Sequence, residues 1–180
     1  MKIQKKDKNY YYIFLGMIII CFLSLTKSNN TKTIEVFSAD KNICILDFQK
    51  PIEGKIVKDI SMDKLIYSKT LNTYRIHDGV DLDGKIGDNV YSIDKGIVES
   101  IYDDSFYGKT IIIDHGEGYR SIYSNIDPLV KEKDIVIKDT KIAKIANNAI
   151  GEIKEKSHLH FSMTLNNKII DPKIEIDFEN

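Results

Sequence analysis

The sequence predicts a mainly β fold, with an antiparallel sheet domain that follows one apolar N-terminal helix. Short runs rich in Ile, Val, Tyr and Thr recur about every 8–15 residues, a spacing typical of antiparallel sheet proteins. Gly, Asn and Asp interrupt these runs at positions that suit turns. The chain has 180 residues. The roughly 150 residues after the apolar segment are enough for one domain with its own core.

The chain begins with a basic stretch followed by an uncharged apolar run. Four lysines precede position 10, and residues 10–25 carry no charge. As a helix this run spans about 24 Å, slightly short of the ~30 Å hydrocarbon core, and its three tyrosines suit the membrane interface. We expect a cytoplasmic tail at 1–9 and a transmembrane anchor at 10–26. By the positive-inside rule, the remaining chain then lies outside the cytoplasm.

A cleaved signal peptide is the alternative reading of this segment. Cleavage requires small residues before the cut, and Leu25-Thr26-Lys27 does not provide them. A retained anchor is therefore favoured. A linker and N-terminal strands at 27–50 and the main domain at 51–176 complete the expected organisation.

Charge and cysteine content exclude several classes of protein. The 26 Lys and Arg nearly balance the 27 Asp and Glu, which excludes a strongly basic nucleic-acid binder. Two cysteines cannot form a disulfide framework or a Cys-rich zinc module. Cys44 is expected to be a small buried residue within a strand at 43–48.

Each expected strand is a run of β-prone residues between turn residues. These runs lie at 33–37, 43–48, 55–60, 89–93, 96–102, 110–114, 119–123, 141–146 and 157–165. Asn166-Asn167 suits a two-residue hairpin turn because Asn tolerates positive φ. One segment, 62–72, is expected to form a short helix.

The first cluster of polar residues is His77-Asp78-Gly79-Val80-Asp81. In an extended chain, positions 77, 79 and 81 face the same way, so the imidazole and the carboxylate flank a glycine that leaves room for an ion. His and Asp are a sensible pair of zinc ligands, but this spacing alone is weak evidence. A polar turn beside a strand remains the alternative.

The second cluster is Ser157-His158-Leu159-His160-Phe161. Strand alternation puts both histidines on one open face and Leu159 and Phe161 against the core. Two exposed surface histidines are the alternative to a metal site. Together the two clusters offer three histidines and one aspartate. Three ligands with one open position is the usual catalytic zinc arrangement, whereas a fourth protein ligand makes a structural site.

An ordered series of motifs resembles the lysostaphin-type, or LytM-type, zinc endopeptidases that cut peptidoglycan cross-links. The series is His77-x-Gly-x-Asp81, Gly87-x-x-Val90, Gly96-x-Val98, Ile113-x-His115-Gly116-x-Gly118-Tyr119, Tyr123 and His158-Leu159-His160-Phe161. The resemblance covers about residues 51–172 and implies a LytM-type domain, the duplicated hybrid motif of antiparallel strands.

The resemblance implies zinc as the cofactor, with His77, Asp81 and His160 as its ligands. It also implies that His158 is a catalytic histidine, and it gives His115 no catalytic role. Active enzymes of the family have a second catalytic histidine at the position of Asn125. Asn forms hydrogen bonds but cannot carry a proton through a cycle, so the resemblance supports metal binding more than hydrolysis.

Residues upstream narrow the resemblance further. With the N-terminal segment, Pro51-Ile52-Glu53-Gly54 and Tyr67-Ser68-Lys69-Thr70-Leu71-Asn72 are similar to the stage II sporulation protein Q group of endospore-forming Firmicutes, in a clostridial form. That likeness implies an interaction module with impaired peptidase activity. Its partner would be stage III sporulation protein AH, bound between the forespore and mother-cell membranes during engulfment.

Two other functions remain open. One is an active peptidoglycan zinc endopeptidase that cleaves stem-peptide cross-links with His158 and Asn125. The other is a metal-free binding module in which the histidines are remnants.

Overall fold

The computed structural model describes residues 46–179. The expected anchor at 10–26, the strand at 33–37, most of the strand at 43–48 and Cys44 lie outside the described residues. None of the helices within 46–179 combines the length and the apolar character that a membrane crossing requires. The expected anchor therefore stays a prediction.

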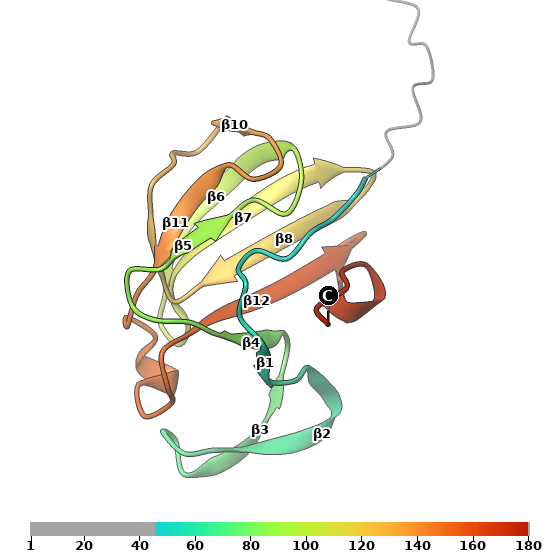
Figure 1. Ribbon diagram of the computed structural model, residues 1–180. Coiled ribbons are helices and arrows are strands. Elements are labelled where there is room, and N and C mark those ends of the chain that lie inside the picture. The colour runs from blue at the N-terminus through green and yellow to red at the C-terminus, as the bar shows by residue number, and fades with distance from the viewer. Residues whose placement is uncertain (1–45, 180) are drawn as a thin grey trace, which may run out of the picture. The chain divides into compact units, whose positions relative to one another are not determined.

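The largest of three antiparallel sheets carries Asp81, His158 and His160, whereas His77 ends a strand of the separate two-stranded sheet. Figure 1 shows how these strands are arranged. The strands of the largest sheet lie in the order β1-β4-β12-β8-β7-β6-β10, and β13 pairs with β12 off this path. Their bounds are β1 Ile56–Lys58, β4 Val80–Asp83, β12 His158–Leu165, β8 Tyr119–Ser124, β7 Gly108–Gly116, β6 Gly96–Asp104, β10 Ile135–Val136 and β13 Lys168–Ile170. Neighbours far apart in sequence, such as β4 and β12, are thus hydrogen-bonded to each other.

A three-stranded sheet completes the core. It has the order β5-β11-β9, with β5 Asn89–Tyr91, β11 Lys141–Ile145 and β9 Ile126–Pro128. Apolar residues of both sheets form one buried cluster, including Leu82, Ile111 and Phe161 from the larger sheet and Val90 and Ile142 from the smaller. The mainly β, antiparallel fold expected from the sequence is confirmed.

The third sheet corrects the one helix expected from the sequence. Residues of the 62–72 segment form β2 (Ser61–Ser68), which pairs with β3 (Thr73–His77) as a two-stranded ribbon. Asn72 has φ 54°, the left-handed conformation that closes the turn between the strands. A short helix here would gain little from packing, since most side chains of β2 are exposed, whereas the ribbon satisfies backbone groups by pairing.

The bend between β3 and β4 corrects a second expectation. Residues 77–81 are not one extended strand, because the chain bends at Gly79 between the two strands. A Cβ at Gly79 would lie 2.5 Å from the carbonyl oxygen of Phe161 and 3.0 Å from Cε1 of His160. Glycine is required here because β12 lies directly against the bend.

Other local expectations are confirmed. Asn166 and Asn167 have φ of 51° and 63° and connect β12 to β13, whose residues Leu165 and Lys168 are paired. Two short 3-10 helices, η1 Ile150–Glu152 and η2 Pro172–Ile174, complete the described chain. Besides β2 and β3, the strands not expected from the sequence are β4, β9, β10 and β13, which have two to four residues each and are too short to show a pattern.

Candidate metal centre

Strand β12 separates the core from the polar site by simple alternation. Leu159 and Phe161 are fully buried in the core, as expected, while His158 and His160 point to the other face. That face is not open, however, because both histidines are only 2% exposed. The expectation of an open face was wrong because Lys58 of β1, Glu152 of η1 and Tyr107 of the turn between β6 and β7 lie against this face.

The structure brings His77, Asp81 and His160 together around one carboxylate oxygen. Asp81 Oδ1 lies 3.1 Å from His77 Nε2 and 2.9 Å from His160 Nδ1. The donor atoms of the three side chains lie within 4.8 Å of one another. Pairing of Asp81 with His160 between β4 and β12 fixes this proximity. Two imidazole nitrogens and a carboxylate oxygen are a donor set that suits zinc.

Neighbouring groups orient the imidazoles. The backbone oxygen of Asp59 contacts His77 Nδ1 at 2.7 Å, which turns Nε2 of that ring toward Asp81. Tyr107 stacks on the His160 ring, with ring centroids 4.0 Å apart and planes at 15°. The Tyr107 hydroxyl donates to Asp78 and accepts from Arg75 at 2.8 Å. Such surrounding contacts fix the side chains that hold a metal.

The same contacts shift the acidity of the cluster. Burial alone would raise the pKa of Asp81, but hydrogen bonds from His160 and His77 hold it well below its ordinary value. Burial opposes the charged form of His160, yet Asp78 and Asp81 outweigh it and raise the pKa of His160 to about 9. Without a metal, the site thus favours ionised carboxylates beside a protonated imidazole.

A second group of side chains, not predicted from the sequence, adjoins the first. Glu152 Oε2 lies 3.1 Å from His158 Nε2, and its Oε1 lies 3.0 Å from Lys58 Nζ. The same ammonium lies 3.5 Å from Asp81 Oδ2. Glu152 is 4% exposed, and Asp81, Glu152 and His158 also have donor atoms within 4.8 Å of one another. Neither Glu152, in a loop, nor Lys58, in a short strand, belongs to a sequence motif that indicates a site.

Asn125 lies beside this cluster with its amide fully engaged by backbone groups. Its Nδ2 donates to the carbonyl of His158 at 2.9 Å, and its Oδ1 accepts from the backbone N–H groups of Asn148 and Ala149 at 3.0 and 3.2 Å. Asn125 is buried and has φ 63°, a conformation that Asn tolerates. Its role in this structure is to connect strands and loops.

His115 lies apart from the other three histidines. Its Nδ1 contacts the carbonyl of Lys95 at 2.7 Å, and its Nε2 contacts Ser121 Oγ at 2.7 Å. The edge of its ring meets the face of Phe48, with centroids 5.5 Å apart. These are the contacts of a satisfied core histidine.

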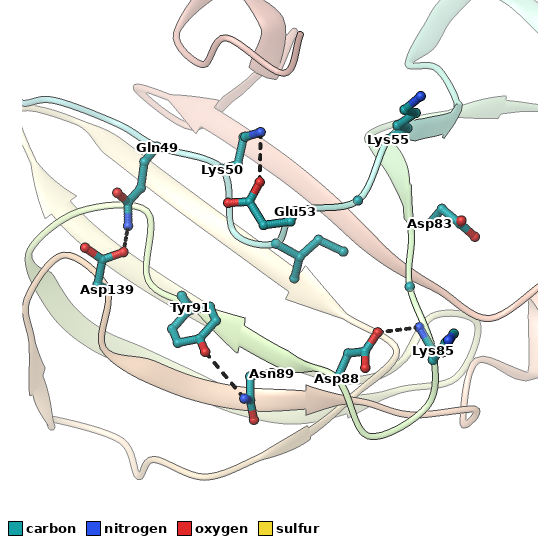
Figure 2. A pocket seen from close by; sticks show the side chains of 13 residues that line it. Gln49, Lys50, Glu53, Lys55, Asp83, Lys85, Asp88, Asn89, Tyr91 and Asp139 are labelled. Atoms are coloured by element: carbon teal, nitrogen blue, oxygen red, sulfur yellow. Dashed lines mark hydrogen bonds and ion pairs between the residues drawn. The ribbon is translucent and has the colours of Figure 1, made fainter. Parts of the chain in front are cut away.

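A cavity of about 940 Å³ is lined by none of the histidines (Figure 2). Among its lining residues, Lys50 pairs with Glu53 at 3.2 Å, and Asp88 accepts a hydrogen bond from the backbone N–H of Lys85 at 2.8 Å.

Two curated proteins align with this chain. The NlpD/LppB homolog of Buchnera aphidicola is 28% identical over 154 residues, which are 84% of this chain and 41% of that protein. The peptidoglycan DD-endopeptidase ShyB of Vibrio cholerae is 32% identical over 96 residues, 53% of this chain and 22% of that protein. The chain therefore spans less than half the length of each relative.

Solved structures share the fold. The SpoIIQ–SpoIIIAH pore-forming complex matches with a TM-score of 0.63 and 22% identity, over 73% of this chain and 92% of that one. A peptidase M23 structure from Pseudomonas aeruginosa matches with a TM-score of 0.59 and 25% identity, over 72% of this chain and 50% of that one. A zinc-containing peptidase from Vibrio cholerae matches with a TM-score of 0.51 and 25% identity, over 69% of this chain and 39% of that one.

A family model decides the classification. The model described as peptidase family M23 matches residues 75–172, more than half of the chain and the whole of the histidine clusters. The match confirms the LytM-type family expected from the ordered motifs. The chain belongs to peptidase family M23.

Proposed function

We propose that this chain is a membrane-anchored, zinc-binding M23 domain that acts as an interaction module and has impaired peptidase activity. His77, Asp81 and His160 hold the metal in this proposal. Support comes from their donor atoms, which lie within 4.8 Å of one another, and from burial of all three side chains. When bound, zinc supplies a Lewis acid that polarises a carbonyl group or a water molecule.

The proposal of impaired catalysis rests on the chemistry and the hydrogen bonds of Asn125. Peptide hydrolysis at a metal needs side chains that move protons, a contribution typically worth ~10²–10⁴ in rate. The Asn125 amide cannot take up or release a proton in this way, and three backbone hydrogen bonds hold it. Asp81 and the four polar groups around it (His77, Glu152, His158 and His160) are also buried, so a peptide reaches them only after side chains move.

The proposed partner follows from the fold neighbour. The fold of this chain is similar to that of a chain in the SpoIIQ–SpoIIIAH pore-forming complex, and the similarity covers 92% of that chain. From this similarity we infer that this chain also binds a partner of the stage III sporulation protein AH type, between the forespore and mother-cell membranes during engulfment. In this setting residues 10–26 anchor the chain, and the domain lies outside the cytoplasm.

The test combines hydrolysis with capture of the partner. Zinc-loaded full-length chain is incubated with peptidoglycan, and mass spectrometry counts new amino termini. His160→Ala serves as the metal-free comparison, and His115→Ala, which removes a buried histidine outside the cluster, serves as the matched control. The proposal expects no new termini, together with capture of a SpoIIIAH-type protein. Termini released by the parent but not by His160→Ala would contradict it.

A second function has one specific observation in its favour. This chain is 32% identical to the DD-endopeptidase ShyB over 96 residues, and it has His77, Asp81 and His160 as proposed ligands together with His158. An active peptidoglycan endopeptidase would therefore use His158 as its remaining proton carrier. The same peptidoglycan assay decides between the two functions.

A further inference from the structure

We propose that Glu152 is the positioning residue of this site: it holds the His158 ring beside the metal cluster, and the turn at 148–152, anchored by Asn125, brings it there. The inference rests on the proposed function only in that it takes the cluster around Asp81 to be the metal site. It gives a role to a buried carboxylate that neither the motifs nor the family match assigns.

The anchoring of the turn is the first step. Asn125 Oδ1 accepts the backbone N–H groups of Asn148 and Ala149, directly before η1. Within η1, the Gly151 N–H donates to the carbonyl of Phe106 at 2.9 Å, and a Cβ at Gly151 would lie 2.1 Å from the Phe106 ring. The turn is therefore fixed at residues 148–149 and again at Gly151, immediately before Glu152.

The hold on the carboxylate is the second step. Its two oxygens have different partners from two different elements: Oε2 faces His158 of β12, and Oε1 faces Lys58 of β1. Lys58 Nζ also lies 3.5 Å from Asp81 Oδ2, so one ammonium lies between the two carboxylates. Glu152 thus meets a compensating charge in a place where an isolated carboxylate would be strongly disfavoured.

The effect on His158 is the third step. Its ring contacts an oxygen at each nitrogen: the carbonyl of Lys156 at Nδ1, at 2.6 Å, and Glu152 at Nε2, at 3.1 Å. A ring held at both nitrogens is fixed in orientation. His158 Nε2 is then kept 3.8 Å from Asp81 Oδ1, next to the proposed ligands without joining them. Glu152 therefore holds the side chain of His158, and Asn125 holds its backbone carbonyl.

The test uses nuclear magnetic resonance of the metal-free full-length chain, so it does not depend on zinc binding or on activity. The readout is exchange with water of the His158 Nε2–H proton. In Glu152→Gln this exchange should be at least about tenfold faster, the size expected when a hydrogen bond to a charged group is lost. The matched control is Glu155→Gln, whose carboxylate lies in the same loop and faces Lys69 at 3.7 Å. The control should leave the proton unchanged.

Further variants test the anchoring and guard against misfolding. Asn125→Ala should speed the same exchange although residue 125 does not touch the ring. Lys58→Met keeps Glu152 but frees one of its oxygens and should give an intermediate rate. Unchanged exchange in a folded Glu152→Gln or Lys58→Met protein would overturn the inference. Absence of hydrolysis or of metal binding would bear only on the proposed function.

Discussion

At the scale of single residues, Asn125 shows how one buried amide can connect several backbone segments. It has positive φ, and its side chain forms hydrogen bonds with three backbone groups. A buried backbone group without a partner costs about 1–3 kcal/mol. The position is therefore coupled to the stability of the 148–152 turn.

Asn125→His should destabilise the protein by about 2–4 kcal/mol, because an imidazole cannot replace both the amide donor and the amide oxygen that accepts twice. We expect a lower unfolding midpoint in urea and no gain of peptidoglycan cleavage. A histidine variant that is as stable as the parent and releases new amino termini would refute this expectation.

His115 should make stability depend on pH. Burial lowers the pKa of His115 below its ordinary value of about 6.5, although its contact with Lys95 opposes the shift. The unfolded chain then binds more protons between the two pKa values. The stabilising contribution is present above about pH 6.5 and is lost as the pH falls through the folded-state value.

The measurement is the difference in unfolding free energy between the parent and His115→Gln across pH 4 to 8. We expect the parent to lose more stability than the variant as the pH falls below about 6.5. Parallel curves for the two proteins would show that His115 does not cause the dependence.

At the scale of elements, the sequence predicts the strands that show alternating apolar and polar residues and the turns that contain residues suited to positive φ. Strand β12 alternates as expected, and the Asn166-Asn167 hairpin forms where two asparagines tolerate positive φ. The segment 62–72 misled because Met, Lys and Leu suit a short helix as well as a strand, and the pairing partner that decides lies outside the segment.

The candidate site was predictable only where motifs mark it. The grouping of His77, Asp81 and His160 was expected, and the structure brings the three together. Glu152 and Lys58 reach the same site from a loop and an edge strand whose positions depend on tertiary packing. No periodicity or spacing in the sequence indicates such an approach.

The bend between β3 and β4 allows a test that separates metal affinity from stability. Gly79→Ala should lower both, because its Cβ would displace the backbone at Phe161 and the ring of His160. Gly87→Ala is the control, since its Cβ meets nothing within 4 Å but its φ of 92° makes any side chain costly. Both variants should lose about 1–3 kcal/mol of stability.

Zinc affinity, measured by competition with a chelator, should fall at least about tenfold for Gly79→Ala alone, a loss near 1.4 kcal/mol. Equal affinities in the two variants would mean that the bend does not position His160.

At the scale of the whole molecule, the proposed ligands connect distant parts of the chain. His77 and Asp81 come from the β3–β4 bend and His160 from β12, and the hydrogen bond between Asp81 and His160 spans 79 positions. A metal bound here stabilises the folded chain relative to the unfolded one by RT ln(1 + [L]/Kd), about 2.7 kcal/mol at one hundred times Kd.

Removal of the metal should therefore lower the unfolding temperature by roughly 5–10 °C for a chain of this size. Scanning calorimetry with and without a chelator measures the shift. The shift should disappear in His160→Ala and persist in His115→Ala. A chelator effect of equal size in both variants would place the stabilising metal elsewhere.

Pairing of β4 with β12 also bears on how fast the site can appear. A strand pair that closes so long a stretch of chain must overcome a large loop-closure entropy before it gains any contact energy, so such sheets fold in milliseconds to seconds. Asp81 and His160 are opposite each other in this pair. During refolding, competence to bind a metal should therefore emerge only in the slow phase that joins the two strands, after the local hairpins β2–β3 and β12–β13 have formed.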